Sequence, residues 1–217
     1  MGCNIMKKII FQGDSITDAC RDRNNSHQTW FGNGAGMGYA NYIMSEIGIK
    51  YPNQFEMLNL GIGGNRIVDM YARIKSDCIN HKPDYLTILI GVNDVWHEYD
   101  FQNGIDEEKY FTLYSMYIDE VKAALPDIKI YIIEPFILPG MATSNKDGMI
   151  EKVKSMAKMA KKVAQKYNLP FITMQDKFDA LCEKAEPSYW LCDGVHPTIF
   201  GYRMMATEIL KVLEKDF

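Results

Sequence analysis

Hydrophobic and polar positions follow two patterns that alternate along the chain. Short apolar runs bounded by turn residues are typical of buried strands, and they cover residues 8–11, 56–60, 85–90, 128–133 and 171–174. Longer segments repeat their apolar residues with the period of a helix, and they cover residues 39–47, 67–80, 107–125, 149–167 and 201–213. Strands that alternate with helices predict an α/β fold, in which helices cover both faces of a parallel sheet as a three-layer α/β/α structure.

Nothing in the sequence divides this alternation into separate parts. The 217 residues contain no internal repeat, low-complexity tract or linker. Since domains run to roughly 150 residues, the sequence predicts a single domain over residues 1–217. The glycine-rich stretch 32–38 is too short for a linker, and we interpret it as a surface loop that leads into a helix.

Charge and composition exclude several classes of protein. The 24 basic and 28 acidic side chains give a net charge of −4, whereas nucleic-acid binding needs a clustered positive surplus. The apolar run 86–92 is far shorter than the roughly 20 residues that span a bilayer, and residues 1–8 lack the apolar stretch of a signal peptide. Five cysteines without a CxxC pair fit free thiols in a reducing compartment. We therefore expect a soluble cytoplasmic protein with no nucleic-acid or membrane partner.

Polar motifs follow the first two predicted strands, and parallel sheets bind ligands at the carboxyl ends of their strands. The motif GDSIT at 13–17 places Ser15 on a tight strand-to-helix turn, where its hydroxyl lies beside backbone N–H groups; a plain helix cap is the alternative. The motif NLGIGGNR at 59–66 has glycines that let the backbone approach a ligand; a turn into the next helix is the alternative. A dinucleotide-binding fingerprint would need a glycine in place of Arg66.

Two later motifs supply an amide and a histidine. In GVND at 91–94, the Asn93 amide is able to donate to an oxyanion, and a turn is again the alternative. In DGVHP at 193–197, one short loop presents His196 together with Asp193, which suits a general base whose second ring nitrogen is held by a carboxylate. No other cluster offers a third metal ligand, so we expect no metal and no cofactor.

The four motifs, in this order, resemble the SGNH-hydrolase, or GDSL-type esterase, superfamily, and the resemblance covers residues 13–197. It implies a flavodoxin-like fold whose five-stranded parallel sheet has the order 2-1-3-4-5. It implies Ser15 as the nucleophile, His196 as general base and then acid, and Asp193 as the residue that orients the imidazole. It also implies a homo-oligomer.

The same resemblance implies an oxyanion hole. Its donors would be the backbone N–H of Ser15, the backbone N–H of Gly64 and the side-chain amide of Asn93. Gly63 is the alternative to Gly64, which is preferred because its place before Asn65 fits the family spacing.

The stretches 13–21, 91–96 and 189–198 are similar to the intracellular acetylxylan-esterase branch of that superfamily. This similarity implies a serine esterase that removes acetyl groups from small acylated carbohydrates, such as acetylated xylo-oligosaccharides, through an acyl-enzyme on Ser15. One alternative is a general short-chain ester hydrolase, thioesterase or lysophospholipase, which chain-length preference would separate. A non-catalytic carbohydrate-binding module and a nucleotide-binding flavodoxin-like protein are the others.

The three tryptophans all lie close in sequence to these motifs. We hypothesise that Trp96 and Trp190 form the walls of a pocket for a small acyl group on a carbohydrate, because flat aromatic faces stack on sugar rings. Trp30 and Phe31 precede the glycine-rich loop. The alternative is that these side chains are core or subunit-interface anchors.

Two smaller expectations concern the neighbours of the site. Cys192, next to Asp193, is interpreted as a small buried filler. Asp18 and Arg21 follow the Ser15 turn, and we expect these two side chains to pair and to support it.

Overall fold

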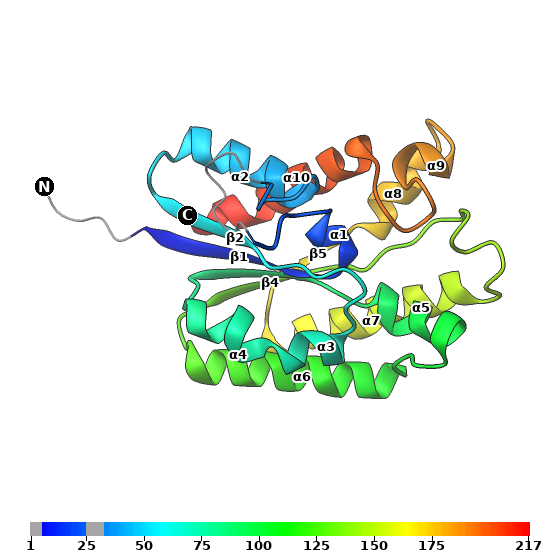
Figure 1. The fold of residues 1–217 in the computed structure, drawn as a ribbon, viewed down its shortest axis with the longest axis horizontal. Coiled ribbons are helices and arrows are strands. Elements are labelled where there is room, and N and C mark those ends of the chain that lie inside the picture. The colour runs from blue at the N-terminus through cyan, green and yellow to red at the C-terminus, as the bar shows by residue number, and fades with distance from the viewer. Residues whose placement is uncertain (1–5, 25–32) are drawn as a thin grey trace, which may run out of the picture.

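A computed structural model describes residues 6–24 and 33–217 and is built on one parallel sheet. Its strands are β1 (Lys7–Gly13), β2 (Phe55–Asn59), β3 (Tyr85–Leu89), β4 (Lys129–Ile133) and β5 (Phe171–Ile172). Neighbouring strands run in the order β2-β1-β3-β4-β5, and every pair is parallel (Figure 1). The predicted five-stranded sheet and its order are therefore confirmed, with β5 shorter than its apolar run.

Helices cover both faces of this sheet. They are α1 (Ser15–Asp18), α2 (Tyr39–Lys50), α3 (Ile67–Ala72), α4 (Ile74–Asp77), α5 (Val92–Phe101), α6 (Glu107–Ala124), α7 (Met149–Tyr167), α8 (Gln175–Cys182), α9 (Pro187–Trp190) and α10 (Ile199–Leu213), with 3₁₀ turns η1 (Ile79–His81) and η2 (Glu214–Asp216). Figure 1 shows α2 and α10 side by side on one face, and α3 to α7 on the other. This arrangement confirms the three-layer α/β/α prediction.

One predicted helix is divided in the structure, and the helices α1, α5, α8 and α9 lie outside the predicted segments. The segment predicted as one helix over 67–80 is divided into α3, α4 and η1, because the backbone leaves the helical region at Arg73 and Cys78. At the first break, the Arg73 guanidinium reaches out of the helix to the Leu60 and Gly13 carbonyls. The helix α5 was not predicted, because the GVND motif at its start reads equally well as a turn.

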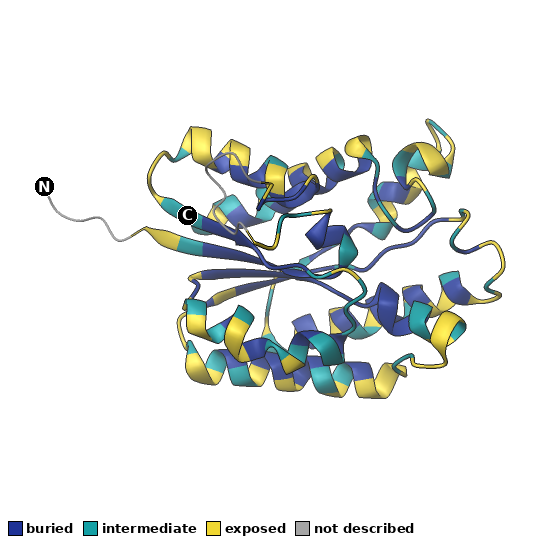
Figure 2. Cartoon of the chain, in the orientation of Figure 1, coloured by how far each residue is buried: buried dark blue, intermediate teal, exposed yellow. Residues whose placement is uncertain are grey.

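The core lies between the sheet and the two helix layers. All five residues of β3 are buried, as expected for a central parallel strand, and Figure 2 shows the buried residues on the strands and on the inward faces of the helices. The register pairs Phe11 with Asn59 and Gly13 with Leu89. Strands β1, β2 and β3 thus end at one edge of the sheet, and the three motifs that follow them meet there.

The structure bears on two further expectations, the absence of a membrane partner and the burial of Cys192. No helix within the described residues is long and apolar enough to cross a membrane. The prediction that Cys192 is buried is wrong, since its side chain is exposed, like that of Cys20. The backbone N–H of Cys192 donates to the His196 carbonyl at 2.9 Å, and the next residue, Asp193, is partly buried. The single domain, the cytoplasmic location and the homo-oligomer stay predictions.

Candidate active site

Ser15 stands at the first position of a four-residue helix directly after β1. Its neighbour Asp14 caps this helix, because its Oδ1 atom accepts the Ile16 N–H at 3.0 Å. The helix ends at once in two left-handed residues, Ala19 (φ 43°) and Cys20 (φ 58°). This short, sharply reversed turn keeps Ser15 partly exposed while Asp14 beneath it is buried.

The Ser15 hydroxyl lies 2.9 Å from Nε2 of His196, a residue 181 positions away in sequence. Nδ1 of the same ring lies 2.7 Å from Oδ2 of Asp193. With the ring proton on Nδ1 donated to Asp193, Nε2 is free to accept the proton of the Ser15 hydroxyl. The structure thus brings together the three residues that the sequence singled out as nucleophile, base and orienting acid.

The loop that carries Asp193 is fixed by its backbone. The other oxygen of Asp193, Oδ1, accepts the N–H groups of Val195 and His196 at 2.9 and 2.8 Å. Gly140 packs against the Asp193 carbonyl so closely that a Cβ there would lie 2.4 Å from it. Both oxygens of the Asp193 carboxylate are engaged, Oδ1 by two backbone N–H groups and Oδ2 by the His196 ring.

These contacts set the charges of the pair. Burial raises the pKa of Asp193, but hydrogen bonds from the His196 ring and from two amides outweigh it and hold that pKa at about 2. The hydrogen bond to Asp193 raises the pKa of His196, against a lowering by burial. Asp193 is consequently charged at neutral pH and favours a positive charge on the imidazole.

The loop after β2 has one free amide among seven consecutive ones. The bonded N–H groups have these acceptors: Gly61 to Asn59 Oδ1, Ile62 to Gly13 O, Gly63 to Asp18 Oδ2, Asn65 to Ile62 O, Arg66 to Asp69 Oδ2 and Ile67 to Asp94 Oδ1. The N–H of Gly64 has no acceptor within the described part of the chain. Gly64 has φ +82°, a left-handed conformation that glycine adopts without strain.

The first turn of α5 faces this loop. Nδ2 of Asn93 donates to the Asn65 carbonyl at 3.1 Å, which fixes the amide plane and leaves its second N–H available. The next residue, Asp94, is fully buried and accepts the Ile67 N–H at 3.0 Å; burial raises its pKa to about 7. Asn93 and Asp94 together tie α5 to both ends of the segment that follows Gly64.

A cavity of about 550 Å³ opens beside Ser15. It is lined by Ser15, Asp18, Ala19, Cys20, Arg21, Arg23, Gly63, His196 and Tyr202. Arg23 and Tyr202 were not predicted, since neither belongs to a motif or to one of the stretches similar to the esterase branch. The expected pairing of the Asp18 and Arg21 side chains is wrong: the Arg21 Nε donates to the Gly61 carbonyl, and Arg23 is the residue that pairs with Asp18.

The tryptophans take different places. The Trp96 ring lies 6.0 Å from the His196 ring, and its Nε1 donates to Asp100 at 2.6 Å. Trp190 instead contacts Tyr189, with ring centroids 4.8 Å apart, and donates to the Ala185 carbonyl. Its described contacts involve neither Ser15 nor His196. Trp30 and Phe31 lie outside the described residues.

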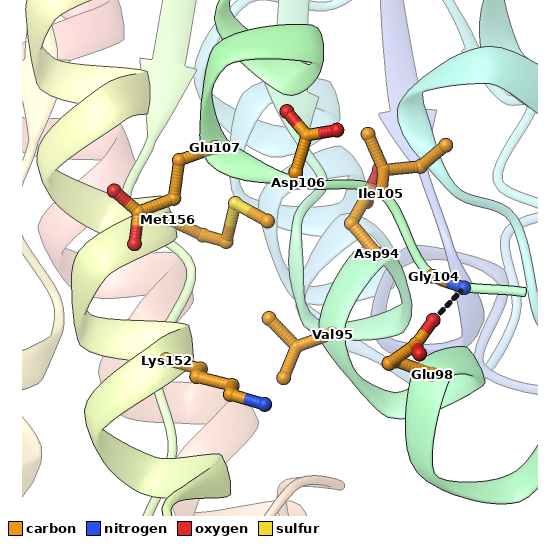
Figure 3. A pocket seen from close by; sticks show the side chains of 9 residues that line it. All are labelled: Asp94, Val95, Glu98, Gly104, Ile105, Asp106, Glu107, Lys152 and Met156. Atoms are coloured by element: carbon orange, nitrogen blue, oxygen red, sulfur yellow. Dashed lines mark hydrogen bonds between the residues drawn. The ribbon is translucent and has the colours of Figure 1, made fainter. Parts of the chain in front are cut away.

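A second cavity, of about 530 Å³, lies between α5, the start of α6 and α7 (Figure 3). Its lining carries four carboxylates and Lys152. The close-up shows the Glu98 carboxylate turned to the Gly104 N–H, and the Asp106 and Glu107 carboxylates do not converge on it. Ser15, Asp193 and His196 take no part in this cavity, so we place the active site at the first one.

Comparison with known proteins shows the family of this chain. A model of the GDSL-like lipase/acylhydrolase family matches residues 11–204. An acetylxylan esterase of Geobacillus stearothermophilus is 32% identical over 215 residues, which cover 94% of this chain and 93% of that protein.

Solved structures give the same result. A crystal structure of a putative GDSL-like lipase from Parabacteroides merdae is similar with a TM-score of 0.87 at 34% identity, covering 96% of this chain and 97% of that one. A crystal structure of Axe2, an acetylxylan esterase from Geobacillus stearothermophilus, has a TM-score of 0.83 at 30% identity, covering 96% and 95% of the two chains. The chain is a carboxylic ester hydrolase that belongs to the GDSL-like lipase/acylhydrolase family.

Proposed function

We propose that this protein is a serine esterase that removes acetyl groups from carbohydrate esters such as acetylated xylo-oligosaccharides. The observation that carries the proposal is the hydrogen-bonded chain from Ser15 through His196 to Asp193, with distances of 2.9 and 2.7 Å. A binding module needs no such chain. The acetylated carbohydrate is inferred from the relative named acetylxylan esterase, which matches 94% of this chain.

The reaction proceeds in two steps. His196 takes the Ser15 proton as the oxygen attacks the ester carbonyl, and it then gives that proton to the departing sugar hydroxyl, which leaves an acyl-enzyme. In the second step, His196 takes a proton from water, the water oxygen attacks the acyl carbonyl, and the proton returns to Ser15 as acetate leaves. Asp193 stabilises the imidazolium in both steps without taking its proton.

The negative oxygen formed in each step needs fixed donors. We assign these to the N–H of Ser15, the N–H of Gly64 and the Asn93 amide. Gly64 is favoured over Gly63 because the Gly63 N–H already donates to Asp18, whereas that of Gly64 has no acceptor among the described residues. A donor held in place before the reaction costs no reorganisation when charge develops.

The test of the proposed function is acetate release from acetylated xylo-oligosaccharides by the purified protein. Ser15→Ala is expected to lower the rate by at least about 10³-fold, because the acyl-enzyme cannot form. Ser45→Ala, which removes an exposed hydroxyl on α2, is the matched control and keeps the parent rate. Release that survives in Ser15→Ala contradicts the mechanism. If the protein hydrolyses 4-nitrophenyl acetate but releases no acetate from the sugars, it is instead a general short-chain esterase. If its activity rises with the length of the acyl chain, it is a lysophospholipase or thioesterase.

The Asn93 assignment predicts a loss in kcat. Asn93→Ala is expected to lower kcat by about 10²–10³ with KM little changed, since the amide acts on charge that develops only in the transition state. Steady-state kinetics measure this, with a urea melt to verify the fold. Asn103→Ala, on an exposed turn, serves as the control. An unchanged kcat in folded Asn93→Ala removes Asn93 from the oxyanion hole.

The Asp193 assignment predicts a change in the pH profile. His196 acts as a base only when neutral, and Asp193 raises its pKa, so the acid limb of kcat/KM lies above the ordinary histidine pKa of about 6.5. In Asp193→Asn the charge that raises the pKa is gone, and the limb moves to lower pH. The rate also falls by about 10⁴, because an amide selects the wrong ring tautomer. Residual activity with an unmoved limb would show that Asp193 does not set the charge of His196.

The aromatic walls predict a selective effect on sugar substrates. Trp96→Ala is expected to lower kcat/KM for acetylated xylo-oligosaccharides by about three- to tenfold relative to 4-nitrophenyl acetate. This factor corresponds to the free energy of one aromatic stacking contact. Trp190→Ala tests the other proposed wall in the same way. Phe101→Ala, an exposed aromatic residue at the end of α5, is the control. If neither tryptophan variant changes the ratio of the two substrates, the carbohydrate pocket is not built from these rings.

A further inference from the structure

The cavity beside Ser15 carries a half-paired guanidinium. Nη2 of Arg23 lies 2.5 Å from Oδ2 of Asp18, and the Arg23 side chain is 53% exposed. Within the described residues, Nε and Nη1 of Arg23 make no hydrogen bond. One side of the fork is therefore held by a protein carboxylate, and the other donors have no partner in the described part of the chain, at a residue that lines the cavity.

Asp18 is in turn a rigid anchor for Arg23. Its side chain is buried, with 9% exposure, and its two oxygens accept the backbone N–H groups of Arg21 and Gly63. An arginine attached to a carboxylate fixed in this way loses less conformational freedom on binding a ligand than a free surface arginine.

The charge balance of the cavity favours an anion. Two guanidiniums, Arg21 and Arg23, line it together with only one carboxylate, Asp18, although the whole chain has a net charge of −4. Arg73, close behind, is balanced by Asp77 at 2.7 Å. Burial is the main cause that lowers the pKa of Arg21; Asp18 raises it, and Arg23 and Arg73 lower it by smaller amounts.

The position of Arg23 relative to Ser15 suits a sugar substituent. A methyl group placed on Gly63 would lie 3.8 Å from the Ser15 Cβ and 3.8 Å from Asp18 Oδ2, to which Arg23 is bound at 2.5 Å. The guanidinium is thus no farther from the nucleophile than the length of a disaccharide. An acetyl group at Ser15 and a substituent on the same or the next sugar ring can be reached together.

We propose that Arg23, held by Asp18, forms a carboxylate subsite that selects acetylated oligosaccharides bearing a uronic acid. A guanidinium fork binds a carboxylate with charge-assisted hydrogen bonds, which a neutral hydroxyl on the same ring does not match. The inference rests on the proposed function for its substrate class, and it extends that function from neutral to acidic xylo-oligosaccharides.

The first measurement compares kcat/KM for two acetylated xylo-oligosaccharides of equal length, one with a glucuronic acid branch and one without. The parent protein is expected to prefer the acidic substrate. In Arg23→Gln the ratio of acidic to neutral kcat/KM is expected to fall about fivefold, the scale of one partly exposed ion pair. Arg23→Lys, which keeps the charge but loses the fork, is expected to fall between the two.

The matched control is Arg203→Gln. Arg203 is equally exposed, at 52%, and it too binds one carboxylate through Nη2, that of Glu46 on α2 at 3.0 Å. It does not line the cavity beside Ser15. The parent ratio is therefore expected in this variant, so a change confined to Arg23→Gln is not a general effect of removing a surface charge.

A second measurement separates this inference from the proposed function. Free glucuronate is tested against glucose as an inhibitor of 4-nitrophenyl acetate hydrolysis, an assay that needs no acetylated sugar as substrate. Stronger inhibition by glucuronate than by glucose, weakened about fivefold in Arg23→Gln but not in Arg203→Gln, supports the subsite even if no acetate is released from xylo-oligosaccharides. Equal inhibition by glucuronate and glucose in the parent protein, or a preference unaltered in folded Arg23→Gln, overturns it.

Discussion

The site depends on the way buried polar side chains satisfy the backbone of the loop between β2 and α3. Asn59, at the end of β2, accepts the Gly61 N–H and donates to the Thr17 and Ala35 carbonyls, so that one buried amide joins this loop to the nucleophile turn. Arg73 donates a hydrogen bond to the Leu60 carbonyl, and Asp18 accepts one from the Gly63 N–H. The partly exposed N–H of Gly64 is the one amide from Gly61 to Ile67 that has no acceptor among the described residues, which marks it as a place for a ligand.

Carboxylates around the nucleophile differ in charge because their surroundings differ. Burial raises the pKa of Asp14 to about 6 and that of Asp94 to about 7, and each has few donors to offset the loss of water. Asp193 is also partly buried, yet the imidazole and two amides keep its pKa at about 2. The carboxylate that we propose balances an imidazolium is thus the one whose charge the fold stabilises, and the other two act as anchors for backbone N–H groups.

Chemistry and substrate choice arise from different parts of the molecule. The proposed reacting groups come from the ends of β1, β2 and β3 and from the loop before α10, which are fixed by the sheet register and by short hydrogen bonds. The groups that would distinguish one ester from another, Trp96 and Arg23, lie on the adjoining helix and loop. Such a division lets one hydrolytic centre serve many esters, since loops vary more freely than strands.

The sequence by itself determined the sheet, and its resemblance to a known family supplied the strand order and the candidate residues of the centre. Alternating apolar runs gave the strands, and the GDSIT, glycine, GVND and DGVHP motifs gave Ser15, Asn93, Asp193 and His196, because these residue types carry their chemistry in short local patterns. Packing decided the rest. The break at Arg73 and the exposure of Cys192 depend on partners distant in the chain.

The pairing of Asp18 with Arg23 rather than with the Arg21 side chain was likewise decided only in three dimensions, and the hydrogen bond from the Gly63 N–H to Asp18 supports the proposed choice of Gly64. The Gly63 N–H meets Asp18 from 45 positions away, and Arg21 meets the Gly61 carbonyl 40 positions away, whereas Arg23 pairs with Asp18 over only 5 positions. Local sequence specifies the groups that are able to bond, whereas the tertiary structure specifies which of them remain free.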